Sequence, residues 1–237
     1  MNVPIILAGG VGSRFGGDRP KQFMEVLGKP LIVYTIELFQ NHPEIDAIEV
    51  VCIESHIGYL KELIEEYGLT KVKWIAPGGK DFQHSVINGV NNLKTELEDD
   101  DIVLVHYGAS PFTTEDVISD AIRVARKYGN SSPAMPSLFL LGSNDGNKST
   151  TWIDRDEVMI FNTPQCFKFK FIKDLYEEAI SKDLISKVEP HTTTLMFLMG
   201  HEIYLSKSNQ MNIKITTKED LDLFEGYVLM KRNRFDK

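Results

Sequence analysis

Residues 5–22 read Ile-Ile-Leu-Ala-Gly-Gly-Val-Gly-Ser-Arg-Phe-Gly-Gly-Asp-Arg-Pro-Lys-Gln, and the rest of the chain is organised around them. The apolar run Val3–Ala8, which overlaps its start, is typical of a central parallel strand that is covered on both faces. The glycines that follow let the backbone approach a ligand closely, and Arg14, Arg19 and Lys21 add positive charge beyond the strand's carboxyl end. We therefore expect this stretch to bind a polyphosphate.

The glycine spacing differs from two common phosphate-binding loops. Gly-x-Gly-x-x-Gly is absent because Phe15 stands where the third glycine would follow Gly10 and Gly12, and Gly-x-x-x-x-Gly-Lys-Ser/Thr is absent as well. A tight strand-to-helix turn would also use glycines, but cations at short spacing and a proline before Lys21 favour phosphate binding. Such cations can neutralise the charge that develops on a triphosphate during nucleotidyl transfer.

The rest of the chain predicts a single α/β domain over residues 1–237. A chain of 237 residues, 42% of them hydrophobic, can bury one sizeable core. Four strand-then-helix units in succession predict a parallel, doubly wound sheet, with strands at 3–8, 47–53, 72–76 and 102–106. Beyond them we expect helices at 171–180, 191–199 and 220–230 and strands at 202–205 and 212–215.

The regular pattern breaks at residues 131–162. Prolines, a cluster of glycine, asparagine and aspartate, and an apparent strand at 157–161 predict an extended hairpin inserted into the α/β pattern. Such an arm packs on a second subunit or folds back on its own domain, and the pattern alone leaves both open.

Composition excludes several classes of protein. Two cysteines, Cys52 and Cys166, argue against a disulfide framework and predict buried thiols. The N-terminus has no basic region, and no apolar segment approaches the length of a membrane span, so we expect a cytoplasmic protein without a membrane partner. A net charge of -8 disfavours nucleic acid as a partner.

Five blocks of sequence, in order along nearly the whole chain, resemble the cytidylyltransferases that act on 2-C-methyl-D-erythritol 4-phosphate and on ribitol 5-phosphate. The blocks are Ala8-Gly9-Gly10-Val11-Gly12-Ser13-Arg14 with Pro20-Lys21-Gln22-Phe23, Gly28-Lys29-Pro30-Leu31, Gly78-Gly79 with Ser85-Val86-x-x-Gly89, Thr163-Pro164-Gln165-x-Phe167, and Asn212-Ile213-Lys214-Ile215-Thr216 before Glu219-Asp220-Leu221. The resemblance implies a Rossmann-like nucleotidyltransferase fold, CTP as nucleotide and Mg²⁺ as metal.

The resemblance also implies roles for individual residues. Arg14, Lys21 and Lys214 would stabilise the α-phosphate under attack. The residues expected to bind the nucleotide are Leu7, Ala8, Gly9, Gly10, Val11, Gly12, Ser13, Gly78, Ser85 and His106. Arg155 would hold the acceptor's phosphate from the partner subunit of a homodimer, which makes residues 131–162 a dimerisation arm.

The chain departs from the family pattern on the metal and acceptor sides. Where the family usually has aspartate and arginine after the fourth strand, this chain has Tyr107 and Ser110; Phe82 replaces another arginine, and Pro190-His191 replaces Thr-Asp. Neutral phenol is a poor ligand for Mg²⁺, so no protein metal ligand is assigned and the metal would be held mainly by the CTP phosphates.

The leading interpretation is therefore transfer of CMP from CTP to a small polyol phosphate, giving a CDP-polyol and pyrophosphate. The pair Gly9-Gly10 favours D-ribitol 5-phosphate as acceptor over 2-C-methyl-D-erythritol 4-phosphate, whose enzymes more often have Ala-Ala-Gly at this point. A CTP-binding protein that has lost catalysis is the alternative of another class, because Tyr107, Ser110 and Phe82 replace charged residues.

Overall fold

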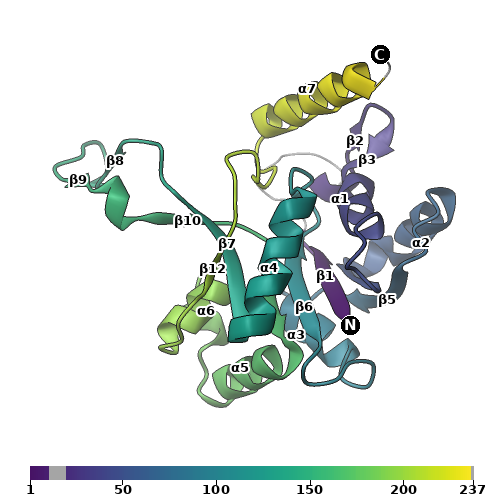
Figure 1. Ribbon diagram of the computed structural model, residues 1–237, viewed down its shortest axis with the longest axis horizontal. Coiled ribbons are helices and arrows are strands. Elements are labelled where there is room, and N and C mark those ends of the chain that lie inside the picture. Colours follow the sequence, from purple (N-terminus) through teal and green to yellow (C-terminus); the bar gives the residue numbers. More distant parts are fainter. Residues whose placement is uncertain (11–19, 236–237) are drawn as a thin grey trace.

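A computed structural model describes residues 1–10 and 20–235 and shows a central sheet with helices on both faces (Figure 1). The strands follow the order β10-β7-β11-β6-β1-β4-β5, and β12 pairs with β7. The parallel core consists of β1 (Asn2–Ala8), β4 (Ile48–Cys52), β5 (Val72–Pro77) and β6 (Ile102–Tyr107). The predicted α/β fold with a mainly parallel sheet is confirmed.

The sheet extends beyond β6 through strands that run mostly antiparallel to their neighbours. Antiparallel pairing joins β11 (Gln165–Lys168) to β6 and to β7 (Asn130–Pro136), and β10 (Met159–Phe161) to β7, whereas β12 (Leu205–Ser206) is parallel to β7. The sequence pattern gave no sign of β11, because its few residues are too short a run to show a period. Its pairing with β6 nevertheless brings residue 165 next to the end of the parallel core.

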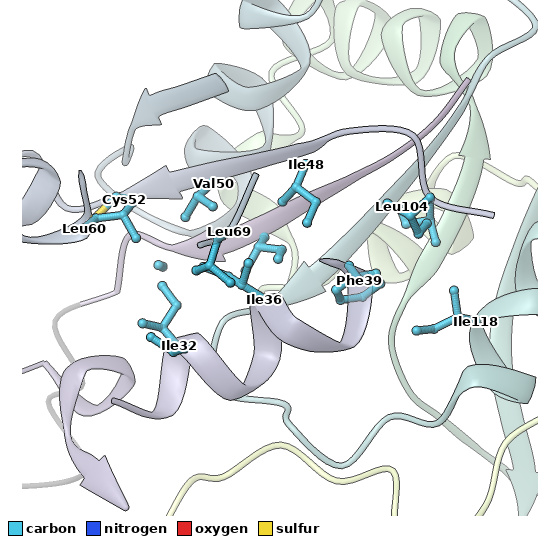
Figure 2. Close-up of a cluster of buried hydrophobic side chains, with 14 of the residues drawn as sticks. Ile32, Ile36, Phe39, Ile48, Val50, Cys52, Leu60, Leu69, Leu104 and Ile118 are labelled. Carbon is cyan, nitrogen blue, oxygen red and sulfur yellow. The ribbon is translucent and has the colours of Figure 1, made fainter. Parts of the chain in front are cut away.

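Helices cover both faces of the sheet and pack their apolar side chains against it. One face is covered by α1 (Leu31–Gln40), α2 (Ile57–Glu66) and α4 (Glu115–Tyr128), and the other by α3 (Phe82–Asn92), α5 (Phe169–Ser181) and α6 (Thr192–Leu198). Ile32, Ile36 and Phe39 follow helical spacing along α1 and reach the strands through Ile48 and Leu104 (Figure 2). Both cysteines are free and buried, as predicted.

β1 shows why its sequence is continuously apolar. Val3 and Ile5 pack on the α3 and α5 side, whereas Ile6 and Ala8 pack on the α1 side. A strand covered on both faces buries successive residues, so it lacks the alternation of an exposed strand. This strand leads directly to the glycines.

The C-terminal region differs from its predicted elements. The expected strand at 212–215 is wrong, because Asn212 binds Thr113 and Thr163 through its side chain and Ile215 donates to the Ala109 carbonyl, so no strand ladder forms. Of the strand expected at 202–205, only residue 205 lies in a strand, the two-residue β12. The last helix, α7 (Lys218–Phe235), begins earlier and ends later than predicted, and it packs a separate cluster over the loop after β6.

The inserted segment is an arm that projects from the sheet (Figure 1). β7 and β10 form its base, and β8 (Leu141–Gly142) pairs with β9 (Trp152–Ile153) farther out, before the short helix η3 (Arg155–Glu157). The predicted hairpin is thereby present. The remaining short elements are β2 (Glu25–Val26), β3 (Lys29–Pro30), η1 (Lys21–Phe23), η2 (Glu54–His56) and η4 (Ile185–Lys187). Among the described helices, none has the length and apolar character needed to cross a membrane.

Candidate active site

A cavity of about 600 Å³ opens at the carboxyl ends of the parallel strands. Leu7 comes from β1, Ile53 follows β4, Gly78 follows β5 and Tyr107 ends β6. Open α/β sheets bind ligands at this edge, because the loops that leave neighbouring strands diverge there. The predicted glycine stretch therefore begins at the expected place for a nucleotide.

Two glycines allow the loops after β1 and β5 to touch. A Cβ atom on Gly78 would lie 2.9 Å from the Cα atom of Gly9, and a Cβ atom on Gly9 would lie 3.0 Å from Ser85 Oγ. Ser85 Oγ accepts a hydrogen bond from the Gly79 N–H at 3.0 Å and donates to the Asp81 carbonyl at 2.8 Å. The wall around Ser85 is thus a tightly packed backbone surface, suited to reading a flat base.

Two cationic side chains of the cavity wall come from distant parts of the chain. Lys21 Nζ donates to the Ile215 carbonyl at 2.6 Å, and Lys214 is the residue before that carbonyl; both lysines line the cavity. Gln22 supports the same region, since its Nε2 donates to the carbonyls of Ala8 at 2.8 Å and Gly10 at 2.9 Å. Opposite ends of the sequence therefore supply positive charge to one cavity.

The strand end of β6 carries an aromatic group where the resemblance implied a carboxylate. The Tyr107 hydroxyl lies 2.7 Å from His191 Nδ1 and donates to the Pro190 carbonyl at 3.1 Å. Lys214 Nζ lies 3.8 Å from the centre of the Tyr107 ring, and the Phe82 ring is 5.7 Å from that ring centre. Three positions that depart from the family pattern, Phe82, Tyr107 and His191, thus form one cluster.

Shifts in pKa keep the two titratable members of this cluster, Tyr107 and His191, uncharged beside Lys214. Burial raises the pKa of Tyr107 above its ordinary value, so the phenol is neutral at physiological pH. Burial also lowers the pKa of His191, and the charge of Lys214 lowers it further. Lys214 therefore faces neutral aromatic groups on this side of the cavity.

A second, smaller cavity of about 250 Å³ lies on the other side of Tyr107. Tyr107 and Lys214 line both cavities. Uncharged polar residues make up much of the second wall, namely Ser110, Asn162, Thr163, Gln165, Thr193, Thr194 and Asn212. Within the described part of the chain, Ser110 Oγ and Gln165 Oε1 are buried without a hydrogen-bond partner. Buried polar atoms of this kind usually have partners.

The structure brings many of the predicted site residues together. Those that line the larger cavity are Leu7, Gly9, Gly10, Lys21, Gly78, Ser85 and Lys214. Ala8 is buried at the end of β1, where its carbonyl accepts from Gln22. Val11, Gly12, Ser13 and Arg14 lie outside the described residues, so their predicted roles stay predictions.

Two predicted residues lie apart from the cavities. His106 is fully buried, its Nε2 lies 3.0 Å from the Ser110 carbonyl, and its ring packs edge-on against Phe39. Burial lowers the pKa of His106 to about 4. Its side chain braces the loop after β6 and lines neither cavity. Arg155 is exposed on the arm and lines neither cavity within one copy of the chain.

Several residues of the site were missed by the sequence reasoning. Gln22 stood in a recognised block but received no role, and nothing in its neighbourhood reveals that it binds two carbonyls. Asp81 caps α3 by accepting from the His84 N–H at 2.9 Å, and an Asp three residues before His84 is a signal that could have found it. Gln165 was quoted in a block, but its place in the second cavity depends on β11.

Comparison with known proteins assigns the family. The model of the family "IspD: 2-C-methyl-D-erythritol 4-phosphate cytidylyltransferase" matches residues 2–230. A ribitol-5-phosphate cytidylyltransferase from Lacticaseibacillus paracasei is 39% identical over 232 residues, covering 98% of this chain and 99% of that protein. A 2-C-methyl-D-erythritol 4-phosphate cytidylyltransferase from Clostridium acetobutylicum is 36% identical over 236 residues, covering 98% and 99%.

A solved structure shows the same fold. The 4-diphosphocytidyl-2C-methyl-D-erythritol synthase from Anaerococcus prevotii superposes with a TM-score of 0.79 at 24% identity, covering 96% of this chain and 98% of that one. Its likeness supports the arrangement of strands and helices described above. With the cavity at the strand ends and the full-length match in sequence, the chain belongs to the IspD family of cytidylyltransferases, a class of nucleotidyltransferases.

Proposed function

We propose that this protein transfers CMP from CTP to D-ribitol 5-phosphate, forming CDP-ribitol and pyrophosphate. The observation that carries the proposal is the pair of cavities that meet at Tyr107 and Lys214. The larger one suits a nucleotide, and the smaller one suits a polyol chain. The similarity to ribitol-5-phosphate cytidylyltransferases, at 39% identity, supports this acceptor, as does the Gly9-Gly10 pair.

In the proposed reaction, a phosphate oxygen of the acceptor attacks the α-phosphorus of CTP. A P–O bond forms between the two, the bond from the α-phosphorus to the bridging oxygen of the β-phosphate breaks, and pyrophosphate leaves with that electron pair. Lys21 and Lys214 would stabilise the added charge on the α-phosphate, which is electrostatic catalysis. Arg14, outside the described residues, is proposed to act with them.

The second cavity is proposed to take the polyol chain. Ser110 Oγ and Gln165 Oε1, both buried, would gain the partners that they lack among the described residues when substrate hydroxyls enter. The cavity wall presents amides and hydroxyls, which can each donate and accept, as a chain of hydroxyl groups requires. Lys214, shared with the nucleotide cavity, would then lie near the acceptor's phosphate.

The described residues do not form a protein cage for Mg²⁺. No group of three or more histidine, cysteine, aspartate or glutamate side chains among them could hold a metal ion, and Tyr107 is a neutral phenol. We propose that the ion enters with CTP, bound to the triphosphate oxygens, as part of the substrate. Protein residues then bind the phosphates and leave the metal to its phosphate and water ligands.

The arm is proposed to join two copies in a homodimer. Phe139, Leu140 and Trp152 are 74%, 91% and 68% exposed on it, an apolar surface that a monomer would leave in water. A second copy would cover these side chains and could bring Arg155 to the acceptor's phosphate in its neighbour. Sedimentation should show a dimer that the double change Leu140→Glu with Trp152→Glu converts to monomers. A wild-type monomer would refute the proposed homodimer.

The cytoplasmic location expected from the sequence stays a prediction.

A panel of acceptors tests the proposed function against its alternatives. CTP, Mg²⁺ and the protein are incubated with D-ribitol 5-phosphate, 2-C-methyl-D-erythritol 4-phosphate or other polyol phosphates, and pyrophosphate release is followed. Preference for D-ribitol 5-phosphate supports the proposal, whereas preference for the methylerythritol substrate supports the family's other named activity. CTP binding without turnover on the whole panel would identify a protein that has lost catalysis.

The residues of the second cavity provide a finer test. Ser110→Ala removes one of the two side chains proposed to bind hydroxyl groups of the substrate. It should raise the KM for the polyol phosphate about tenfold, with a smaller effect on the KM for CTP. Ser55→Ala, an exposed serine outside both cavities, is the matched control. Equal effects of Ser110→Ala on both substrates would remove the assignment of this cavity to the acceptor.

A further inference from the structure

Among the described residues, an aromatic side chain and a cation are shared by the two cavities, and further rings pack on that aromatic side chain. Lys214 Nζ lies over the face of the Tyr107 ring, 3.8 Å from its centre, and Tyr107 and Lys214 line both cavities. A ring face attracts an ammonium through its quadrupole. It holds the cation in place without cancelling its charge.

A carboxylate at residue 107 would act differently. It would form an ion pair with Lys214 and offset the positive charge that the lysine presents to phosphates. The neutral phenol contacts the ammonium at the ring face and does not offset its charge. The aromatic replacement therefore has a physical consequence for the lysine and is more than the loss of a metal ligand.

The ring itself is held by its neighbours. The Tyr107 hydroxyl lies 2.7 Å from His191 Nδ1 and donates to the Pro190 carbonyl, which ties β6 to the segment before α6. Phe82 packs on Tyr107 and also on His191, with ring centres 6.1 Å apart in the second pair. These contacts restrict the ring to one orientation, and so restrict the ammonium that lies over it.

We propose that Tyr107 is a positioning residue for Lys214, with its ring holding the ammonium at the boundary of the two cavities. The proposal deepens the proposed function and rests on it for the identity of the ligand, CTP. It assigns the aromatic cluster to the alignment of a phosphate-binding cation.

A double-mutant cycle on CTP affinity tests the proposal, with calorimetry in the presence of Mg²⁺. Tyr107→Leu, which removes the ring, should weaken CTP binding about tenfold, the effect of losing a partly desolvated cation–π contact. Lys214→Met should weaken it further. In the Lys214→Met background, Tyr107→Leu should add less than about a twofold effect, because it acts through the lysine. A full tenfold effect in that background would overturn the proposal.

Two further variants separate the ring from general damage to the site. Tyr107→Phe keeps the ring and loses the hydrogen bonds, so it should recover CTP affinity to within about threefold of wild type. Tyr128→Leu is the matched control, since Tyr128 carries Lys127 over its ring at 4.7 Å but lies outside both cavities. It should bind CTP as wild type does. Equal losses in Tyr107→Phe and Tyr107→Leu would contradict a role for the ring.

A measurement without ligand distinguishes this proposal from the proposed function. In NMR spectra of protein with isotopically labelled lysine, the side-chain signals of Lys214, assigned by their loss in Lys214→Met, should be shifted upfield by the ring in wild type and in Tyr107→Phe. They should return to the ordinary lysine position in Tyr107→Leu. Signals that stay unchanged in Tyr107→Leu would overturn the positioning role. Upfield signals and a coupled cycle without turnover on any acceptor would refute the proposed function and leave this role standing.

Discussion

Replacing Glu49 with glutamine should remove a large part of the pH dependence of stability. Glu49 lies in β4 with its side chain fully buried against α3. Its Oε1 accepts from Asn92 Nδ2 at 2.8 Å, whereas Oε2 is without a partner among the described residues and lies near Gly89, beside methyl groups of Ile5 and Val51. Burial raises the pKa of Glu49 to about 8, and the hydrogen bond from Asn92 only partly opposes that shift.

The size of the effect follows from the difference in proton binding by Glu49 between the folded and the unfolded chain. In the unfolded chain this carboxyl has an ordinary pKa near 4.5, so between that pH and about 8 the folded protein holds one proton more. The stabilising contribution is complete below the unfolded pKa and is lost as the pH rises through the folded pKa. The slope is about 1.4 kcal/mol per pH unit in the middle of the window. Between pH 6 and pH 8 the free energy of unfolding should fall by about 2 kcal/mol from this group.

Denaturant unfolding at pH 6 and pH 8, at one protein concentration, measures the difference. Glu49→Gln keeps an acceptor for Asn92 and does not titrate. From pH 6 to pH 8 its free energy of unfolding should therefore fall by about 2 kcal/mol less than that of wild type. Glu62→Gln, at an exposed position on α2, is the control and should retain that change. The same pH dependence in wild type and Glu49→Gln would show that Glu49 does not titrate with a raised pKa in the folded protein.

Three other predictions concern the nucleotide cavity. Lys21→Ala should lower kcat about 10²- to 10³-fold with an unchanged circular dichroism spectrum. The control Lys61→Ala, at an exposed position, should have the kcat of wild type. Unaltered turnover in Lys21→Ala would show that Lys21 has no catalytic role. Gly78→Ala places a Cβ atom 2.9 Å from Gly9 Cα and should lower the affinity for CTP measured by calorimetry. In the control Gly58→Ala the added Cβ atom meets no atom within 4 Å, so the affinity should stay unchanged. Equal affinity in both variants would show that the close contact of Gly78 with Gly9 does not matter for CTP binding. Mg²⁺ alone should leave the melting temperature unchanged and raise it only with CTP, so a shift without CTP would reveal a protein metal site.

The parallel core was predictable because its signals are local. Residues 3–8 are apolar on both faces of β1, and Gly9 and Gly10 follow directly, so strand and ligand loop could be placed from neighbouring residues alone. The helices on each side showed the period of an amphipathic helix. Burial and hydrogen bonding over short spans determine these elements, and a single sequence records them.

The antiparallel extension and the C-terminal segment were less predictable, because distant contacts determine them. β11 is defined by pairing with β6 and β7, and residues 212–215 are held by side chains of Thr113, Asn162 and Asn212. The segment Ile213-Lys214-Ile215 alternates apolar and charged residues as a strand does, wherever it lies. Only the partner decides whether a ladder forms.

The candidate site divides in the same way. Gly9, Lys21, Gly78 and Ser85 were found from blocks of sequence, and the structure gathers them around one cavity. The contact of Tyr107 with His191 joins residues 84 positions apart, so no spacing rule could predict it. Read singly, Phe82 and Tyr107 suggested lost function, but in space they pack with His191 in an aromatic cluster beside Lys214.

The proposed transfer of CMP is tested by the identity of the product formed from CTP, Mg²⁺ and D-ribitol 5-phosphate, followed by ³¹P NMR. The two adjoining cavities predict paired signals of a new pyrophosphate diester, CDP-ribitol, with release of one inorganic pyrophosphate per CTP consumed and loss of the reaction in Lys21→Ala. If CTP binds but CTP and the polyol phosphate both remain unchanged, the protein does not catalyse this transfer.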